Sequence, residues 1–599
     1  MSLFSKKSGE RPEDIHYEGS AVLRMLSYLK PHVKTVAVCL LLVLVLTGLE
    51  LYRPILTGDA IDRYIAGEYA PGEAVEARFR GLLLAAGLYL GTLAISFFCN
   101  NRLMILLQRT GQRIVYEMRR ELFEHVESLS MRFFDLTPVG KIVTRVTNDV
   151  EAVNELYANI LVKLFRNVVK IIGLAVVMLA LDVRMALLSF VMVPLVTVLT
   201  VITRMLALRA NREMRTRLTE LNTFLSEHLS GMKIIQIFNR EERKFQEFAA
   251  RSNAHYRASF RAMMVNAVFR PFIVLTGVVA MAIVIAAGSH GVLEGTVSFG
   301  TMYIFLQYIR TFFEPIQDLA EQLSTLQSAV ASAEKIFTLL DEKPLLHDPE
   351  TPVEPEEIHG RIEFKHVWFA YDNENFILRD VSFVIEPGQR VAFVGATGAG
   401  KSSILNLIGR YYDVQKGEIL IDGINIKDLS RERLRRAIGQ VQQDVFIFTG
   451  DIRSNIRLRE EDITDMDIRD ASRRVNADRF INRLPGGYGE RVTERGSTFS
   501  AGQRQLLSFA RTLAFHPDIL ILDEATANID TETEQWIQEA LETMMTGRTT
   551  IMVAHRLSTV QHADKIIVMH KGRICESGTH QELLEQGGIY QKLYQLQLA

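Results

Sequence analysis

Long runs of apolar residues fill the first half of the chain and restrict what it can fold into. A membrane-spanning helix needs about 20 such residues, because hydrocarbon offers no partner for backbone N–H and C=O groups and a helix satisfies its own. Residues 361–599, by contrast, carry the evenly spread charge of a soluble domain. Six segments meet the requirement, and we expect spans at Val33–Leu56, Phe79–Leu103, Leu161–Leu181, Met185–Leu206, Val265–Gly288 and Val297–Phe313.

The third span is interrupted by Lys163, Arg166 and Lys170, which we place at a membrane end where long basic side chains reach the interface. Basic residues stay on the cytoplasmic side of a span, so their distribution predicts the orientation. They follow the second and fourth spans, which places both termini in the cytoplasm. These residues are Arg109, Arg113, Arg119, Arg120 and Lys141 after the second span, and Arg204, Arg209, Arg212 and Arg215 after the fourth.

The charge balance and the cysteines exclude other classes of protein. The chain has 68 basic and 70 acidic residues, which gives no reason to expect nucleic acid as a partner. Cys39, Cys99 and Cys575 show no CxxC spacing for a metal and no even set for disulfides, so we interpret them as structural thiols.

The organisation follows from these spans and from the breaks between them. The amphipathic segment Ala21–Lys30, ended by Pro31, suits a helix in the membrane interface. Residues 108–157 and 208–262 are charged with helical periodicity, and we expect them to extend the spans into the cytoplasm. The predicted fold is an α-helical membrane domain followed by an α/β domain. The boundaries are 1–32 for the N-terminus and interfacial helix, 33–340 for the membrane domain, 341–360 for a proline-rich linker and 361–599 for the α/β domain.

A phosphate-binding loop follows the apolar strand predicted at Val391–Val394. Glycines in such a loop let backbone N–H groups curl around phosphates at a helix N-terminus, and the lysine reaches the outer phosphates. The Ser402 hydroxyl is the expected magnesium ligand. The cofactors are therefore ATP and Mg²⁺, held by Gly395, Ala396, Thr397, Gly398, Ala399, Gly400, Lys401, Ser402 and Ser403.

A second buried strand, Ile519–Leu522, ends in Asp523, which is placed to hold the metal. Glu524 beside it can polarise the attacking water, because phosphoryl transfer asks mainly for charge neutralisation and a positioned nucleophile. A third strand, Thr550–Val553, leads to His555, which could contact the terminal phosphate. Glu524 and His555 are the predicted catalytic residues.

The order and spacing of these motifs resemble the nucleotide-binding domains of ABC transporters, which implies that 361–599 is an α/β P-loop ATPase domain with a helical subdomain. The further motifs are Val367–Tyr371, Gln442–Asp444 and Phe499–Gln505, and the preceding six-span region is similar to that of ABC exporters. The resemblance implies that Tyr371 stacks on adenine, that Gln443 joins the magnesium shell and that Thr493–Gly496 touches the intracellular loops. It also implies that ATP is sandwiched between two such domains, each facing the other's signature segment. The implied contacts to nucleotide from this segment and beyond it are Ser500, Gly502, Gln503 and Asp530.

Two positions depart from the family's pattern. The usual Leu-Ser-Gly-Gly-Gln signature is Phe499-Ser-Ala-Gly-Gln503 here, and Ala527 stands where Ser is common. With Glu524 intact, the chain resembles the catalytically intact subunit of heterodimeric bacterial multidrug exporters. We therefore favour a heterodimer with a second half-transporter, and the alternative is a homodimer that tolerates Ala501.

Force between the two halves would pass through Met131–Asp135 and Ser230–Phe238, the predicted coupling turns. The sixth span carries Gln307, Arg310 and Glu314 among aromatic residues, which suits amphipathic compounds. Arg310 and Glu314 could instead pair one turn apart, and Glu50 and Arg53 in the first span pose the same alternative.

The prediction is thus an ATP-hydrolysing exporter of small amphipathic or hydrophobic compounds, working by alternating access in the bacterial inner membrane. A lipid flippase and a peptide or metabolite exporter are alternatives within the class. A regulatory ABC protein that gates without pumping is the alternative from another class, and intact Glu524 and His555 argue against it.

Overall fold

The structure is a computed structural model of the 599-residue chain, and it describes residues 19–66, 75–372, 375–458, 462–523, 531–553 and 560–598. Two compact units make up the chain. A helical unit comprises Met1–Glu127 and Val139–Glu342, and an α/β unit comprises Ser128–Pro138 and Lys343–Ala599.

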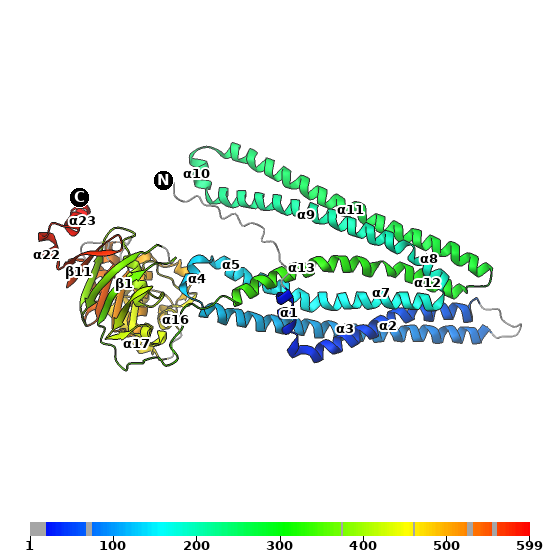
Figure 1. The fold of residues 1–599 in the computed structure, drawn as a ribbon, viewed down its shortest axis with the longest axis horizontal. Coiled ribbons are helices and arrows are strands. Elements are labelled where there is room, and N and C mark those ends of the chain that lie inside the picture. The colour runs from blue at the N-terminus through cyan, green and yellow to red at the C-terminus, as the bar shows by residue number, and fades with distance from the viewer. Residues whose placement is uncertain are drawn as a thin grey trace. The chain divides into compact units, whose positions relative to one another are not determined.

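Long helices that run antiparallel to their neighbours in the chain build the helical unit (Figure 1). A short helix, α1 (Gly19–Ser27), precedes them, as the amphipathic pattern predicted. A continuous helical path also connects α5 (Val139–Thr144) through α6 (Val150–Glu155) to α7, with π-helical turns at Arg145–Asp149 and Leu156–Ile160. The long helices and their neighbours are α2 (Val33–Tyr64), α3 (Val75–Ser128), α7 (Leu161–Leu181), α8 (Val183–Phe190), α9 (Met192–Ser230), α11 (Glu241–Leu293), α12 (Phe299–Phe312) and α13 (Glu314–Leu340).

Within the described residues, five helical stretches are long and apolar enough to cross a membrane. They overlap the first five predicted spans, and only 6–25% of each apolar window is buried inside the chain, so the exposed apolar surface is that expected of helices that lie in lipid or against a partner subunit. The sixth predicted span contains α12, whose 14 residues fall short of a membrane thickness before α13 begins at Glu314. The sixth span therefore remains a prediction. The five stretches are Ala21–Tyr64, Val75–Ser128, Val139–Leu181, Val183–Ser230 and Leu275–Leu293.

The helices α2 and α12 meet through their backbones at two buried glycines, Gly58 and Gly300. A Cβ built on Gly300 would lie 2.2 Å from the Gly58 carbonyl oxygen, and one built on Gly58 would lie 2.6 Å from Ile304 Cδ1. Asp62 then caps the start of α12, accepting hydrogen bonds from Gly300 N at 2.7 Å and Ser298 Oγ at 2.6 Å. Glycine is needed here because any side chain would push the two helices apart.

Replacing Gly300 with alanine should destabilise this contact by about 1–3 kcal/mol, because the added methyl group meets backbone rather than a movable side chain. The thermal midpoint of the detergent-solubilised protein measures the effect. Gly87→Ala in α3 is the matched control, because a Cβ there meets nothing within 4 Å. Equal midpoints for the two variants would contradict the close helix contact.

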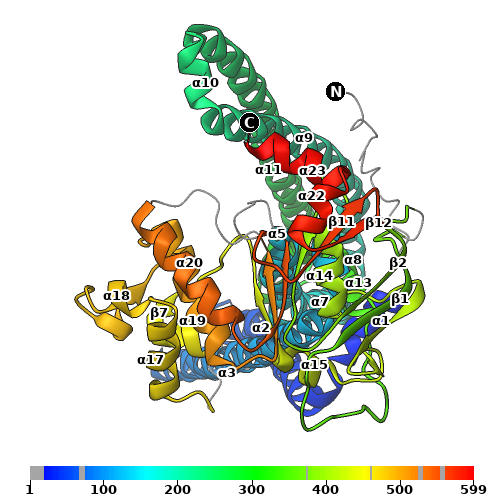
Figure 2. The same cartoon turned by 90° about the vertical axis from the view of Figure 1, so that its left-hand side faces the viewer.

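Two short helices form where the coupling turns were predicted. Helix α10 (Met232–Ile237) joins α9 to α11, which run side by side as a long antiparallel pair (Figures 1 and 2). Helix α4 (Met131–Leu136) lies between α3 and α5 in the sequence and belongs to the compact α/β unit. Both predicted coupling turns thus contain a short helix, and α13 ends at Leu340, immediately before the predicted linker.

A six-stranded sheet forms the centre of the α/β unit, in the order β12-β11-β3-β10-β9-β6. Its strands are parallel except for the antiparallel pair β11 and β12. The strand predictions at Val391, Ile519 and Thr550 are confirmed. The strands are β3 (Arg390–Val394), β6 (Ile438–Val441), β9 (Ile519–Asp523), β10 (Thr549–Val553), β11 (Lys565–His570) and β12 (Arg573–Gly578).

A four-stranded antiparallel sheet, β2-β1-β4-β5, packs against this centre through a shared apolar core that includes Phe364, Phe383 and Phe393. Its strands are β1 (Ile362–Phe369), β2 (Leu378–Ile385), β4 (Lys416–Ile421) and β5 (Ile424–Asn425). A pair of two-residue strands, β7 (Gly450–Asp451) and β8 (Arg491–Val492), forms a third small sheet. The helices surrounding the sheets are α14 (Lys401–Ile408), α15 (Arg431–Ala437), α20 (Thr531–Met545), α22 (His580–Glu585) and α23 (Ile589–Leu598).

The predicted helical subdomain lies between β6 and β9 in the sequence, and a second apolar core holds it together. Phe480 and Phe499 pack in this core with their ring centroids 6.2 Å apart. Its helices are α16 (Ile452–Arg457), α17 (Asp465–Arg474), α18 (Asp478–Ile481) and α19 (Ala501–Ala514), and Figure 2 shows α19 and α20 beside one another.

Candidate functional site

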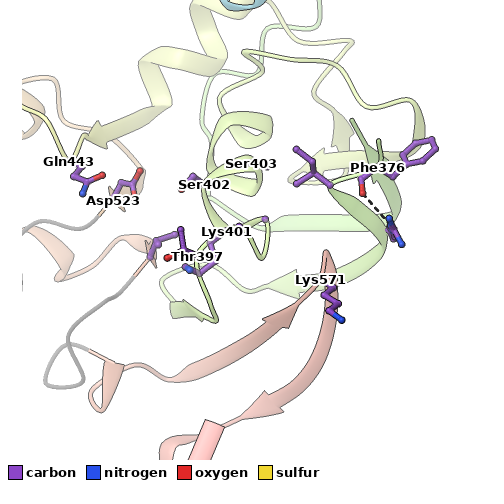
Figure 3. A pocket seen from close by; sticks show the side chains of 13 residues that line it. Phe376, Thr397, Lys401, Ser402, Ser403, Gln443, Asp523 and Lys571 are labelled. Carbon is purple, nitrogen blue, oxygen red and sulfur yellow. Dashed lines mark hydrogen bonds between the residues drawn. The ribbon is translucent and has the colours of Figure 1, made fainter. Parts of the chain in front are cut away.

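A pocket of about 800 Å³ opens in the α/β unit at the predicted phosphate-binding loop (Figure 3). Loop residues, the start of α14 and the ends of several strands contribute to its wall. Its described lining residues are Phe376, Ile377, Arg379, Thr397, Gly398, Gly400, Lys401, Ser402, Ser403, Gln443, Asp523, Val553 and Lys571.

The loop turns sharply between β3 and α14. Its glycines adopt backbone conformations, and allow close approach of neighbouring atoms, that a side chain would prevent. Gly400 has a φ of 104° and a Cβ on it would lie 2.6 Å from Leu378 Cδ2. A Cβ on Gly395 would lie 2.3 Å from the Met569 carbonyl oxygen. Gly400 is the N-cap of α14, so the loop brings backbone N–H groups to the pocket at the positive end of that helix.

Lys401 is the first residue of α14 and is buried, with 6% of its surface exposed. Its ammonium group donates hydrogen bonds to the Gly395 carbonyl at 2.7 Å and to the Ala396 carbonyl at 3.2 Å. A buried ammonium group needs acceptors, and the carbonyls of its own loop supply them. The lysine therefore lies folded over the loop, beside the place where phosphate oxygens are expected.

The topology of the sheet brings the three predicted metal ligands to one pocket. Asp523 ends β9, Gln443 follows β6, and these strands are parallel neighbours in the sheet. Ser402 follows β3, which is separated from β9 by β10 alone. Figure 3 shows Gln443 and Asp523 together on one side of the pocket, with Ser402 and Lys401 beyond them. Hydroxyl, amide and carboxylate oxygens are the ligands that Mg²⁺ prefers, so this set fits the ion.

Tyr371, the predicted adenine platform, follows β1 and lies close to α14. Its hydroxyl lies 3.2 Å from Ser403 Oγ and accepts a hydrogen bond from Asn406 Nδ2 at 3.3 Å. Its ring packs edge-on against Phe369, with centroids 4.8 Å apart. Among the described residues that line the pocket, the aromatic one is Phe376 rather than Tyr371.

The signature residues form the start of α19. Ser500 is the N-cap and forms a reciprocal capping box with Gln503: Ser500 Oγ accepts from Gln503 N at 3.2 Å, and Gln503 Oε1 accepts from Ser500 N at 3.0 Å. Gly502 is buried and Ala501 is exposed. Of the residues that the structure describes around the phosphate pocket, none is Ser500, Gly502 or Gln503.

Helix α19 is also tied to the segment that follows Gln443. Arg511 of α19 donates to the Asn455 carbonyl at 2.8 Å and to the Phe446 carbonyl at 3.1 Å. Burial lowers the pKa of this guanidinium, which nevertheless stays charged because the ordinary pKa of arginine is so high. The signature helix and the Gln443 segment are therefore held together within one domain.

Three predicted site residues, Glu524, Asp530 and His555, lie outside the described residues. The described strands end close to two of them: β9 ends at Asp523 and β10 ends at Val553.

The charged residues of the predicted spans pair across helices. Glu50 of α2 forms ion pairs with Arg166 and Lys170 of α7, the latter with a Nζ–Oε2 distance of 3.7 Å. Glu314 pairs with Lys170, at 3.8 Å, which differs from the pairing with Arg310 that helical spacing suggested. Arg310 is exposed.

Arg53 of α2 also bonds to a neighbouring helix. Its guanidinium donates to Thr92 Oγ1 of α3 at 3.3 Å and to Ser96 Oγ. Two of the three basic residues that we place at a membrane end, Arg166 and Lys170, thus face an acidic partner on another helix. Their spacing of four residues places both on one face of a helix, and this pattern in the sequence could have indicated a shared partner.

The sequence gives no indication that Phe376, Arg379 and Lys571 line the nucleotide pocket. Only the folded sheets bring the β1–β2 and β11–β12 connections to it.

A phosphate-binding pocket of this form, in one chain with several apolar helices, defines an ATP-driven membrane transporter. A model of the ABC transporter transmembrane region matches residues 36–316, and a model described as ABC transporter matches residues 378–527. The chain belongs to the ABC transporter family. It is an exporter subunit with an ATP-binding domain that couples ATP hydrolysis to transport, and proteins of this class work as dimers in a lipid bilayer.

Several similar proteins match over nearly the whole chain. It is 40% identical to a putative ABC transporter ATP-binding protein of Streptococcus pneumoniae, over 96% of this chain and 97% of that one. It is 40% identical to a probable multidrug resistance ABC transporter ATP-binding/permease protein of Bacillus subtilis, over 91% and 81%. It is 35% identical to an ATP-dependent lipid A-core flippase of Syntrophus aciditrophicus, over 96% and 94%.

A solved structure of similar fold is a bacterial Atm1-family ABC exporter with ATP bound. It matches with a TM-score of 0.77 and 27% sequence identity, covering 94% of this chain and 98% of that one. The agreement extends over both units, so the order of membrane domain and ATPase domain is common to the two proteins.

Proposed function

We propose that this chain is one half of a multidrug-type exporter that uses MgATP to move amphipathic or hydrophobic compounds out of the cytoplasm or the inner leaflet. The observation that carries the proposal is the phosphate-binding pocket in a chain whose other half contains helices long and apolar enough to cross a membrane. One relative is named as a probable multidrug resistance transporter, which supports the substrate class. In this proposal both termini lie in the cytoplasm and the chain spans the plasma (inner) membrane of a bacterium, and the bacterial organisms of the relatives support the bacterial origin.

In this proposal ATP binds with its phosphates on the Gly395–Ser403 loop and its adenine against Tyr371. Ser402, Gln443 and Asp523 would hold Mg²⁺, which would neutralise phosphate charge when bound. Glu524 polarises the attacking water, and His555 contacts the terminal phosphate. The further contacts to nucleotide across the dimer come from Ser500, Gly502, Gln503 and Asp530.

The second half-transporter is a different chain, in our proposal, because Ala501 replaces a signature glycine. Ala501 is the first residue of α19 and is exposed, so its methyl group causes no conflict within this chain and would crowd only a nucleotide presented by the partner. The altered signature then faces the partner's weaker site, while this chain's loop and Glu524 complete the active one. A homodimer that tolerates Ala501 is the competing assembly.

Turnover of the chain purified alone in nanodiscs tests the assembly. We expect ATP hydrolysis at least about tenfold below that of the chain purified with its partner, because a lone subunit cannot complete a nucleotide sandwich with an unaltered signature. Ala501→Gly is the informative variant and should raise the turnover of the chain alone. Full turnover by the unaltered chain alone, unchanged by Ala501→Gly, would exclude the heterodimer.

The substrate class is tested by stimulation of ATP hydrolysis across a panel of amphipathic drugs, phospholipids and peptides in proteoliposomes. Gln307 of α12 donates to the Tyr303 hydroxyl at 2.9 Å, which leaves an aromatic helix with few polar groups, suited to amphipathic compounds. We expect stimulation by amphipathic drugs. Stimulation by phospholipid alone would favour the flippase alternative, which the name of one relative also supports.

A further inference from the structure

Within the α/β unit, helix α4 is hydrogen-bonded to a tyrosine, Tyr412, whose ring contacts Tyr371. The Tyr412 hydroxyl donates a hydrogen bond to Asp135 Oδ2 of α4. Asp135 and Tyr412 are 277 residues apart in the sequence, yet both belong to the same compact unit. Burial, together with the hydrogen bond to Asp135, raises the pKa of the Tyr412 hydroxyl, so the group remains a protonated donor at physiological pH.

The ring of Tyr412 packs against the ring of Tyr371 on one side. The two rings meet edge-on at 87°, with centroids 4.9 Å apart, and Tyr412 also contacts Phe369 with centroids 5.7 Å apart. Such aromatic pairs are worth about 0.5–1.5 kcal/mol beyond their buried area and have a preferred geometry. A change in the orientation of Tyr412 therefore changes the position that Tyr371 prefers.

Hydrogen bonds hold together the two chain segments that carry these tyrosines, one around Ala370 and the other at 410–415. The side chain of Gln415 donates from Nε2 to the Ala370 carbonyl at 2.8 Å and accepts at Oε1 from Ala370 N at 3.0 Å. Arg410, with 3% of its surface exposed, holds the start of the same segment through the Leu429 carbonyl at 3.2 Å. Because the backbones are fixed, the side chains of Tyr371 and Tyr412 are the parts that can respond to α4.

Beyond Tyr371 the contacts reach the phosphate loop helix. The Tyr371 hydroxyl lies 3.2 Å from Ser403 Oγ, and Ser403 lines the nucleotide pocket one residue after Ser402. An unbroken series of contacts thus runs from Asp135 through Tyr412 and Tyr371 to Ser403. It connects the predicted coupling helix to Tyr371, the proposed adenine platform, and through it to Ser403 in the wall of the pocket.

We propose that Tyr412 is a positioning residue that sets the orientation of Tyr371, and with it the affinity for ATP, according to whether α4 supplies Asp135. The proposal rests on the proposed function, because it requires ATP in this pocket and force passing through α4. Without Asp135 the Tyr412 hydroxyl loses this acceptor, and the Tyr412 ring no longer holds the Tyr371 ring in one orientation. Nucleotide must then order both side chains when it binds, which lowers its affinity.

A double-mutant cycle of Asp135→Ala and Tyr412→Phe in the assembled transporter, reconstituted in proteoliposomes with MgATP, tests this proposal. Each substitution should raise the KM for ATP by about three- to tenfold with kcat within about twofold, and the double variant should show no further rise, because both remove one link. Tyr411→Phe is the matched control: it removes a hydroxyl from the adjacent residue, whose ring lies under the Arg435 guanidinium, and should leave KM unchanged.

Three outcomes separate the possibilities. Additive increases in KM, or a KM unchanged in both single variants, would overturn the role of Tyr412. A fall in thermal midpoint with equal loss of kcat for Tyr412→Phe would show that the residue only supports the fold, and this also overturns the proposal. Absence of MgATP hydrolysis in the unaltered transporter would instead contradict the proposed function itself.

Discussion

Replacing Glu524 with glutamine is expected to leave MgATP binding intact while lowering turnover by about 10²- to 10⁴-fold. Glutamine keeps the shape of glutamate but cannot accept a proton from the attacking water, and phosphoryl transfer depends on the placement of that nucleophile. The position follows directly on Asp523, the last residue of β9, at the pocket edge of the sheet. Nucleotide binding and ATP hydrolysis, measured on the same reconstituted sample, check the two halves of the prediction.

Glu542→Gln is the control for this substitution, because it makes the same chemical change at an exposed position of α20 in the same domain. It should leave both binding and turnover unchanged. Normal turnover in the Glu524 variant, with the partner subunit present, would mean that another group polarises the water.

Replacing Lys401 with alanine should remove ATP binding as well as turnover, the latter by about 10²- to 10³-fold. The ammonium group is buried at the start of α14 and is held by loop carbonyls, so it is in place for the outer phosphates before nucleotide arrives. Its loss leaves the phosphate charge without its nearest cation, whereas loss of the Glu524 carboxylate acts only after binding. Equilibrium binding of a fluorescent ATP analogue distinguishes the two variants.

Lys571→Ala is the matched control for Lys401, because Lys571 lines the same pocket from the connection between β11 and β12 (Figure 3). It should change affinity only within a few-fold. Equal losses of binding in the two lysine variants would indicate that general positive charge, rather than a positioned ammonium group, attracts the nucleotide.

The phosphate loop could be predicted because its chemistry is local. Glycines, a lysine and a hydroxyl residue stand together after one strand, and Gly400 and Lys401 adopt the conformations that this requires. Asp523 could be predicted for the same reason, since it directly ends an apolar strand. Its meeting with Gln443 depended on the parallel pairing of β6 with β9, which came from the family resemblance rather than from the residues.

Contacts between distant segments were harder to predict. The spacing of Arg310 and Glu314 suggested a pair along one helix, yet Glu314 pairs with Lys170 on another helix. The pattern along a single helix cannot indicate which neighbouring helix will pack against it. The interaction of Tyr412 with Asp135 is of the same kind, because 277 residues separate the two positions.

The structure also refined the reading of Tyr371. An aromatic residue after an apolar strand carries no information on the rotamer of its ring, and here the hydroxyl is directed to Ser403 and Asn406. The sixth predicted span ends at Phe313, and α12 likewise ends at Phe312, just before Glu314 begins α13.

In our proposal, capture of ATP between two subunits moves the membrane helices. Amide hydrogen exchange of the assembled Glu524→Gln transporter in nanodiscs, with and without MgATP, measures this coupling. We expect increased protection at the start of α19 together with changed exchange in α10 and α12, and neither effect in the Lys401→Ala protein. Protection confined to residues 395–403, with α10, α12 and α19 unchanged, would contradict it.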